Sequence, residues 1–231
     1  MSIDKKPDEK KLFDKLIEKS DLKQLVYHNT FHSFKVFKEV IEQMKLAYHK
    51  HASEKKTKYD VPFEVKARSE FEAELKFGGD ILIFMMHSNV FEFPRGHRVM
   101  NTSYIKEDKN RSYCGVINIY NFLADSFKYN RLNDVGYLIG RVFINKDNHY
   151  FIEGKRELGY LYNNFGQNVL TKETVELIAA AAIQYTINFD LLTPPYEQVK
   201  EVSLHEITTV IDSLTLKTGK RLGFKFQADE E

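Results

Sequence analysis

The stretch from Val61 to Phe77 constrains the fold most, because apolar and charged residues alternate along it with a period of two. Successive side chains of a β-strand point to opposite faces of the sheet. The pattern therefore predicts an antiparallel strand with one buried face and one solvated face. Strands usually contain about 3–10 residues, so a strand of this length is unusual. We expect a bend or a bulge near Ser69.

The segments that follow predict a meander of further strands. Gly78-Gly79-Asp80 is a strong turn signal. The continuous apolar run from Ile81 to Met86 is typical of a central strand that is covered on both faces. More strands, the middle two of them joined as a hairpin, are predicted at Tyr113–Tyr120, Val135–Ile144, His149–Ile152 and Leu222–Phe226.

The N-terminal part of the chain has helical periodicity. Apolar residues at helical spacing predict a short amphipathic helix that starts near Leu12 and ends near Ser20. Asn29 or Thr30 is the expected N-cap of a longer helix, whose apolar stripe extends to Tyr48. This stripe needs a partner, which is either the sheet of the same chain or a second copy of the helix.

The C-terminal part predicts two more helices. Thr171 caps a helix that continues to Tyr185 and is apolar nearly all round, so we expect it to be buried in the core. A capping box at 203–206 opens the last helix. The order of elements predicts an α+β fold, in which a central, mostly antiparallel sheet carries helices on one face or end. We expect an N-terminal helical segment at 1–57 and an α+β domain at 58–231.

Composition narrows the class of protein. Charged residues make up 29% of the chain and the net charge is +1, which gives no argument for a nucleic acid or a membrane surface as the partner. The single cysteine, Cys114, excludes an internal disulfide and fits a reducing compartment. The N-terminus lacks the apolar region of a secretory signal, and no apolar run could span a bilayer. We expect a soluble, cytoplasmic protein.

Metal and phosphate motifs are weak in this sequence. His28 and His32 are four residues apart, but no HExxH arrangement accompanies them. The pair His49 and His51 lies at the other end of the same predicted helix, roughly 30 Å away. We therefore expect no metal site. The sequence has neither a P-loop nor a GxGxxG fingerprint, so it identifies no cofactor.

Polar residues inside apolar strands are the strongest indication of a site. Arg141 lies between Gly140 and Val142, and Asn118 interrupts another apolar run. A charge in such a run must be paired or must face a cavity. Arg141 is thus either part of a structural ion pair, with Asp125 or Glu153, or an anchor for a ligand. The candidate ligand-binding residues, at strand ends or within strands, are Asn118, Asn121, Asp125, Tyr129, Arg131 and Arg141.

Three residues are candidates for catalysis. His87 and His97 could act as acid or base, and Cys114 could act as a nucleophile if a base or a positive charge adjoined it. The alternative for Cys114 is a small buried residue, because free cysteines are among the most buried residue types. Aromatic residues reach 13% without any tryptophan. They indicate a Phe-rich core with Tyr at its edges, or a stacking surface for a ring-bearing ligand.

The sequence identifies no reaction, and it leaves three functional hypotheses in order of preference. The first is a non-enzymatic ligand-binding, sensory or regulatory module that forms a homodimer through residues 30–52. The second is a small-molecule enzyme with His87 or His97 as acid or base and Arg141 as an anion anchor. It predicts a concave pocket that joins at least three of the candidates. The third is a scaffold subunit with an exposed apolar patch.

Overall fold

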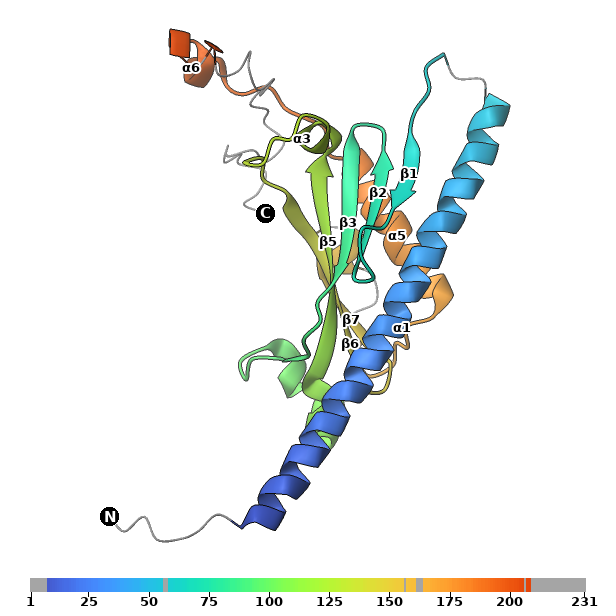
Figure 1. The fold of residues 1–231 in the computed structure, drawn as a ribbon, viewed down its shortest axis with the longest axis vertical. Helices are drawn as coiled ribbons and strands as arrows, with labels where there is room; N and C mark the ends of the chain where they lie inside the picture. Colours follow the sequence, from blue (N-terminus) through green and yellow to red (C-terminus); the bar gives the residue numbers. More distant parts are fainter. Residues whose placement is uncertain (1–7, 56–57, 156, 161–163, 206, 209–231) are drawn as a thin grey trace.

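The fold is a single open antiparallel sheet with two helices packed on one of its faces (Figure 1). The computed structural model describes residues 8–55, 58–155, 157–160, 164–205 and 207–208. The long helix α1 and the shorter helix α5 cover the same face, and their apolar residues join those of the sheet in one core. The α+β fold class predicted from the sequence is confirmed.

The sheet of the described residues has seven strands in the order β1-β2-β3-β5-β6-β7, and β4 pairs with the first part of β5. The strands are β1 (Phe63–Lys66), β2 (Glu72–Phe77), β3 (Asp80–Met86), β4 (Phe91–Glu92), β5 (Tyr113–Leu123), β6 (Tyr137–Asn145) and β7 (Tyr150–Gly154). Every paired neighbour runs antiparallel, and the register of β5 on β6 shifts at a bulge between Ile119 and Tyr120.

The single strand predicted over 61–77 is wrong, although the predicted break near Ser69 is in the right place. The stretch folds into β1 and β2, which pair with each other around a connection at 67–71. Lys38 of α1 donates hydrogen bonds to the backbone oxygens of Ser69 and Glu70, which attaches this connection to the helix. The alternation survives because both strands place their apolar residues on the helix-covered face.

Helix α1 (Glu9–Lys55) is continuous, so the predicted break before Asn29 and Thr30 is wrong. Asn29 does not cap a helix. Its side-chain amide donates to the backbone oxygens of Asn145 and Lys146, at 3.1 and 2.9 Å. Thr30 bonds back to the oxygen of Val26, one turn earlier. A tertiary contact of Asn29 with the β6–β7 turn and a bond of Thr30 within α1 thus explain two residues that look like a helix start.

Helix α5 (Lys172–Ile187) begins as predicted, since the Thr171 side chain accepts a hydrogen bond from the backbone N–H of Thr174. Its predicted burial on all sides is wrong. Ile178, Ala179 and Ala182 face the core, whereas Leu177 is 48% exposed. The helix packs by one face against α1 and the sheet.

The opposite face of the sheet has its own, smaller apolar cluster. This cluster consists of Phe93, Val99, Ile105, Cys114, Val116, Phe143, Phe151 and Phe165. It is covered by the segment between β4 and β5, which contains the short helices η1 (Arg98–Asn101), α2 (Ser103–Glu107) and η2 (Lys109–Ser112). The remaining short helices are α3 (Ala124–Lys128), α4 (Glu157–Tyr160) and α6 (Tyr196–Val199). The predicted strand at 222–226 and most of the predicted last helix lie outside the described residues.

The apolar stripe of residues 30–52 packs inside the chain, against the sheet and α5. Leu46, 66% exposed, is the one large apolar side chain in that range that points mostly to solvent. The N-terminal end of α1 projects beyond the sheet (Figure 1) and exposes Leu12, Leu16 and Ile17. Within the described residues, no helix combines the length and the apolar character needed to cross a membrane. The dimer through residues 30–52 stays a prediction.

Candidate functional site

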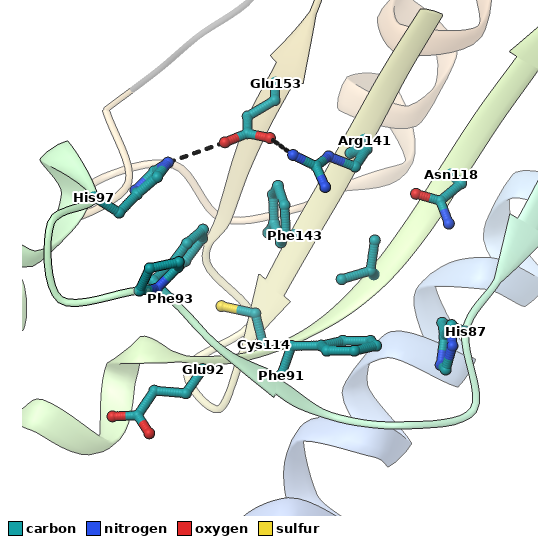
Figure 2. A pocket seen from close by; sticks show the side chains of 12 residues that line it. His87, Phe91, Glu92, Phe93, His97, Cys114, Asn118, Arg141, Phe143 and Glu153 are labelled. Carbon is teal, nitrogen blue, oxygen red and sulfur yellow. Dashed lines mark hydrogen bonds and ion pairs between the residues drawn. The ribbon is translucent and has the colours of Figure 1, made fainter. Parts of the chain in front are cut away.

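A cavity of about 330 Å³ opens on the face of the sheet opposite α1 and α5 (Figure 2). The segment that leaves β3 and pairs with β5 as β4 forms one wall, and β5, β6 and β7 form the floor. The cavity is lined by His87, Phe91, Glu92, Phe93, Pro94, His97, Cys114, Val116, Asn118, Arg141, Phe143 and Glu153. It joins five of the residues selected from the sequence, which are His87, His97, Cys114, Asn118 and Arg141.

A row of polar residues crosses the floor of the cavity from β5 to β7. The register pairs Asn118 with Arg141 and Arg141 with Glu153. Directly opposite residues of neighbouring strands point to the same face, so the three side chains stand side by side. Arg141 forms an ion pair with Glu153, one of the two partners considered for it from the sequence. Its side chain is still 44% exposed, so it also faces the cavity.

His97 completes the partners of Glu153. Its Nε2 lies 2.9 Å from a Glu153 carboxylate oxygen, and its Nδ1 accepts the backbone N–H of Val99 at 3.3 Å, at the start of η1. A backbone N–H can only donate, so Nδ1 has no proton, and the proton on Nε2 is donated to Glu153. Both ring nitrogens of His97 are therefore engaged.

His87 lies at the opposite rim. Its backbone N–H donates to the oxygen of Val116, and its Nδ1 accepts the backbone N–H of Asn89 at 3.0 Å. By the same reasoning its Nε2 carries the proton and is a donor. The ring meets Phe91 edge to face, with the ring centroids 4.8 Å apart. His87 itself is exposed.

The cavity walls are aromatic. Phe93 stacks on the His97 ring with centroids 4.7 Å apart, and it contacts Phe143 at 4.9 Å. The guanidinium of Arg141 lies over the same Phe143 ring, 5.3 Å from its centroid. Aromatic side chains supply large apolar area with defined ring orientations. These rings give the cavity an apolar, aromatic wall.

Cys114 lies among these walls but is 1% exposed. Burial raises the pKa of its thiol well above the ordinary value. A cysteine nucleophile needs a thiolate, which a basic partner or a positive charge would stabilise. Its surroundings in the smaller apolar cluster fit the alternative of a small buried residue.

The charges in the polar row cancel. Arg141 and Glu153 are opposite in charge and form an ion pair. Glu92 also lines the cavity, but it points away from the row (Figure 2) and accepts a hydrogen bond from the hydroxyl of Tyr113 at 2.9 Å. Asn118 makes no side-chain hydrogen bond to any part of the chain that the structure describes, so its amide N–H₂ and oxygen are open to the cavity.

The other candidate residues lie elsewhere. Asn121 is 8% exposed and donates to Asp80 and to backbone oxygens, which is a structural role at the start of β3. Asp125 is exposed on α3. Tyr129 and Arg131 follow α3, beside a second cavity at the far end of β5. The first cavity thus contains only two of the six ligand-binding candidates, Asn118 and Arg141.

Sequence reasoning missed the three aromatic contributors to the cavity, which are Phe91, Phe93 and Phe143. Phe143 carries a signal in the sequence, since it is two residues from Arg141 and shares its face of the strand. Glu153 was considered only as a structural partner, although it is two residues from Phe151 and also faces the cavity side. Phe91 and Phe93 are also two residues apart, but the run is too short to predict a strand, because their segment has only two strand residues.

No group of three or more His, Cys, Asp or Glu side chains among the described residues is arranged to hold a metal ion. Comparison with known protein families, curated proteins and solved structures finds no match to this chain. The interpretation of the site therefore depends on its own geometry.

Proposed function

We propose that the protein is a non-enzymatic binding module whose cavity takes a small, neutral, ring-bearing molecule. The ring lies against Phe93 and Phe143, and an edge that carries both a donor and an acceptor meets Asn118. The observation that carries this proposal is the open Asn118 amide beside a charge-balanced pair, under aromatic walls. A volume of about 330 Å³ is at the small end of ligand pockets, which typically measure about 300–1,000 Å³.

Charge balance argues for a neutral ligand. Because Glu153 already neutralises Arg141, an anionic or cationic ligand would lose its hydration shell without gaining an unpaired charge of opposite sign. An amide or a heterocycle edge loses less hydration and can exchange two hydrogen bonds with Asn118. A neutral amide therefore fits this row better than a carboxylate or an amine on the same ring.

The enzyme alternative has support from the predicted pocket, which joins more than three candidates. It lacks a free base in the described site. His97 has both nitrogens engaged, and burial keeps Cys114 as a neutral thiol. His87 offers a donor to the cavity and can position a ligand. To act as a base it would have to accept a proton on Nδ1, and this would break the hydrogen bond that Nδ1 accepts from the backbone N–H of Asn89.

Calorimetric titration with three molecules that share one ring tests the proposal: benzamide, benzoate and benzylamine. We expect benzamide to bind about tenfold tighter than either charged analogue. Asn118→Leu, which keeps the shape of the side chain and removes its amide, should weaken the binding of benzamide by about tenfold. Asn133→Leu, at an exposed position away from the cavity, is the matched control and should have no effect. Equal affinity for all three molecules, or an unaffected Asn118→Leu variant, would refute the proposal.

Self-association is the second part of the proposed function, and the N-terminal end of α1 favours it. Leu12, Leu16 and Ile17 are 55–66% exposed and share one side of the helix. A second copy could cover them in an antiparallel helix pair. Light scattering should find a dimer that Leu16→Glu converts to a monomer, whereas Leu46→Glu, within residues 30–52, leaves it intact. A monomeric wild-type chain at 100 μM, far above the Kd of about 1 μM expected for a stable pair, would contradict this part.

A further inference from the structure

A second cavity, of about 340 Å³, lies beside α3 near the end of β5. Figure 1 shows α3 at the end of the sheet where β5 terminates. The cavity is lined by Arg68, Phe122, Ser126, Phe127, Asn130, Arg131, Leu132 and Asp134. None of these residues lines the cavity of about 330 Å³ described above, called the ring cavity from here on, which contains residues from the other half of β5.

Arg131 is the unusual residue of this second cavity. Its side chain is 8% exposed, yet it makes no hydrogen bond with the described part of the chain. Its Nε is buried without any partner. Buried polar groups in native proteins are nearly always hydrogen-bonded, and a guanidinium carries a full charge with five N–H donors. An arginine in this state indicates that something else completes its environment.

The nearest carboxylate does not complete it. Asp134 Oδ2 lies 3.7 Å from Arg131 Nη1, which is too long for a hydrogen bond. The same oxygen accepts the hydroxyl of Ser126 at 2.6 Å, and this bond holds the carboxylate in place. The Tyr129 ring lies 5.4 Å from the Arg131 guanidinium and adds a weaker cation–π contact. The charge of Arg131 is therefore only partly balanced.

A second guanidinium lines the same cavity. Arg68 pairs with Glu74 at 3.2 Å and lies over the Phe127 ring, with 61% of its side chain exposed. Its remaining donors are free to meet solvent or a ligand. Two arginines therefore border a cavity whose other walls, Phe122 and Leu132 among them, are apolar. Arginine forks match the paired oxygens of carboxylates and phosphates.

We propose that this cavity binds a small oxyanion, through a carboxylate or phosphate group that pairs with Arg131 and is bordered by Arg68. The Arg131 guanidinium turns toward the cavity when the oxyanion binds, which gives its buried Nε an acceptor. The inference is independent of the ring cavity, because it depends on different residues and on a preference for an anion rather than for a neutral molecule.

Nuclear magnetic resonance of the wild-type chain tests the proposal directly. The Nε–H resonance of Arg131, assigned through bonds, is followed while inorganic phosphate is added, and separately acetate, against sodium chloride at equal ionic strength. We expect a saturable shift of this resonance with at least one of the two anions and none with chloride. The stronger anion distinguishes a phosphate ligand from a carboxylate ligand. The proposal fails if neither anion gives a saturable shift by about 20 mM. A dissociation constant above this concentration means binding weaker than a single charge-assisted pair would provide.

Two variants separate this site from the proposed function. Arg131→Gln should weaken the binding of the anion by about tenfold or more, because it removes the positive charge and the paired N–H donors of the guanidinium. Arg141→Gln, in the ring cavity, should leave anion binding unchanged. If Arg141→Gln rather than Arg131→Gln removes the binding, the anion occupies the other cavity and this inference is wrong. If Arg131→Gln does not fold, the wild-type titration decides, since it needs no variant.

Discussion

Gly115 of β5 lies against Thr30 of helix α1, and its replacement by alanine tests how the fold supports the site. A Cβ at this position would lie 2.0 Å from Oγ1 of Thr30 and 2.7 Å from its Cβ and Cγ2. Thr30 is fully buried in the middle of α1, so it cannot swing away. Relief requires α1 to move off β5 by roughly 1 Å, which loosens the packing of Phe34 and Phe37.

We expect Gly115→Ala to lower the free energy of unfolding by about 3 kcal/mol, at the upper end of the usual cost of overpacking. For a urea m value of about 3 kcal/mol/M, the midpoint falls by about 1 M. Gly79→Ala is the matched control, because no atom lies within 4 Å of its Cβ position. It should be neutral or stabilise by up to about 1 kcal/mol. A Gly115→Ala variant within about 0.5 kcal/mol of the control would refute the close packing of α1 on β5.

Three further predictions concern titrating groups. Cys114 should react with a thiol reagent at pH 8 at least about 100-fold more slowly in the folded chain than in urea, because its pKa is raised by burial. Burial, together with Asp147, raises the pKa of Tyr104 to about 12, so its contribution to stability is complete below pH 10 and is lost as pH rises through 12. Between pH 10 and pH 12 the free energy of unfolding should therefore fall more for the wild type than for Tyr104→Phe. Equal losses would contradict the raised pKa of Tyr104. Glu153→Gln should leave Arg141 unpaired and reverse the ligand preference from benzamide to benzoate in calorimetry, whereas Glu92→Gln should not.

The sheet was largely predictable from local patterns. Period-two alternation identifies which residues face α1 and α5, and Gly78-Gly79 marks the turn before β3. Thr171 is recognisable as an N-cap because its side-chain hydrogen bonds are made to the first turn of α5. Asn29 was misread, since the turn after β6 competes for its amide. Local propensity cannot reveal such a tertiary contact.

The site was only partly predictable. Asn118 and Arg141 stand out because polar side chains interrupt apolar strands. Their adjacency depends on the register of β5 on β6, which includes a bulge whose position the sequence does not mark. The aromatic wall from Phe91 and Phe93 depends on an irregular segment that folds back over the sheet. Arg131 was selected with the same group, but the strand length separates it from the ring cavity.

The central claim is that a neutral ring-bearing molecule meets the open amide of Asn118. The most direct measurement follows the side-chain N–H₂ resonances of Asn118 during titration with benzamide and, separately, benzoate. The account predicts a saturable shift with benzamide and a much weaker response to benzoate, while the amide of Asn121, already bonded to Asp80, stays unchanged. Unshifted Asn118 resonances at a benzamide concentration that saturates binding would contradict the claim.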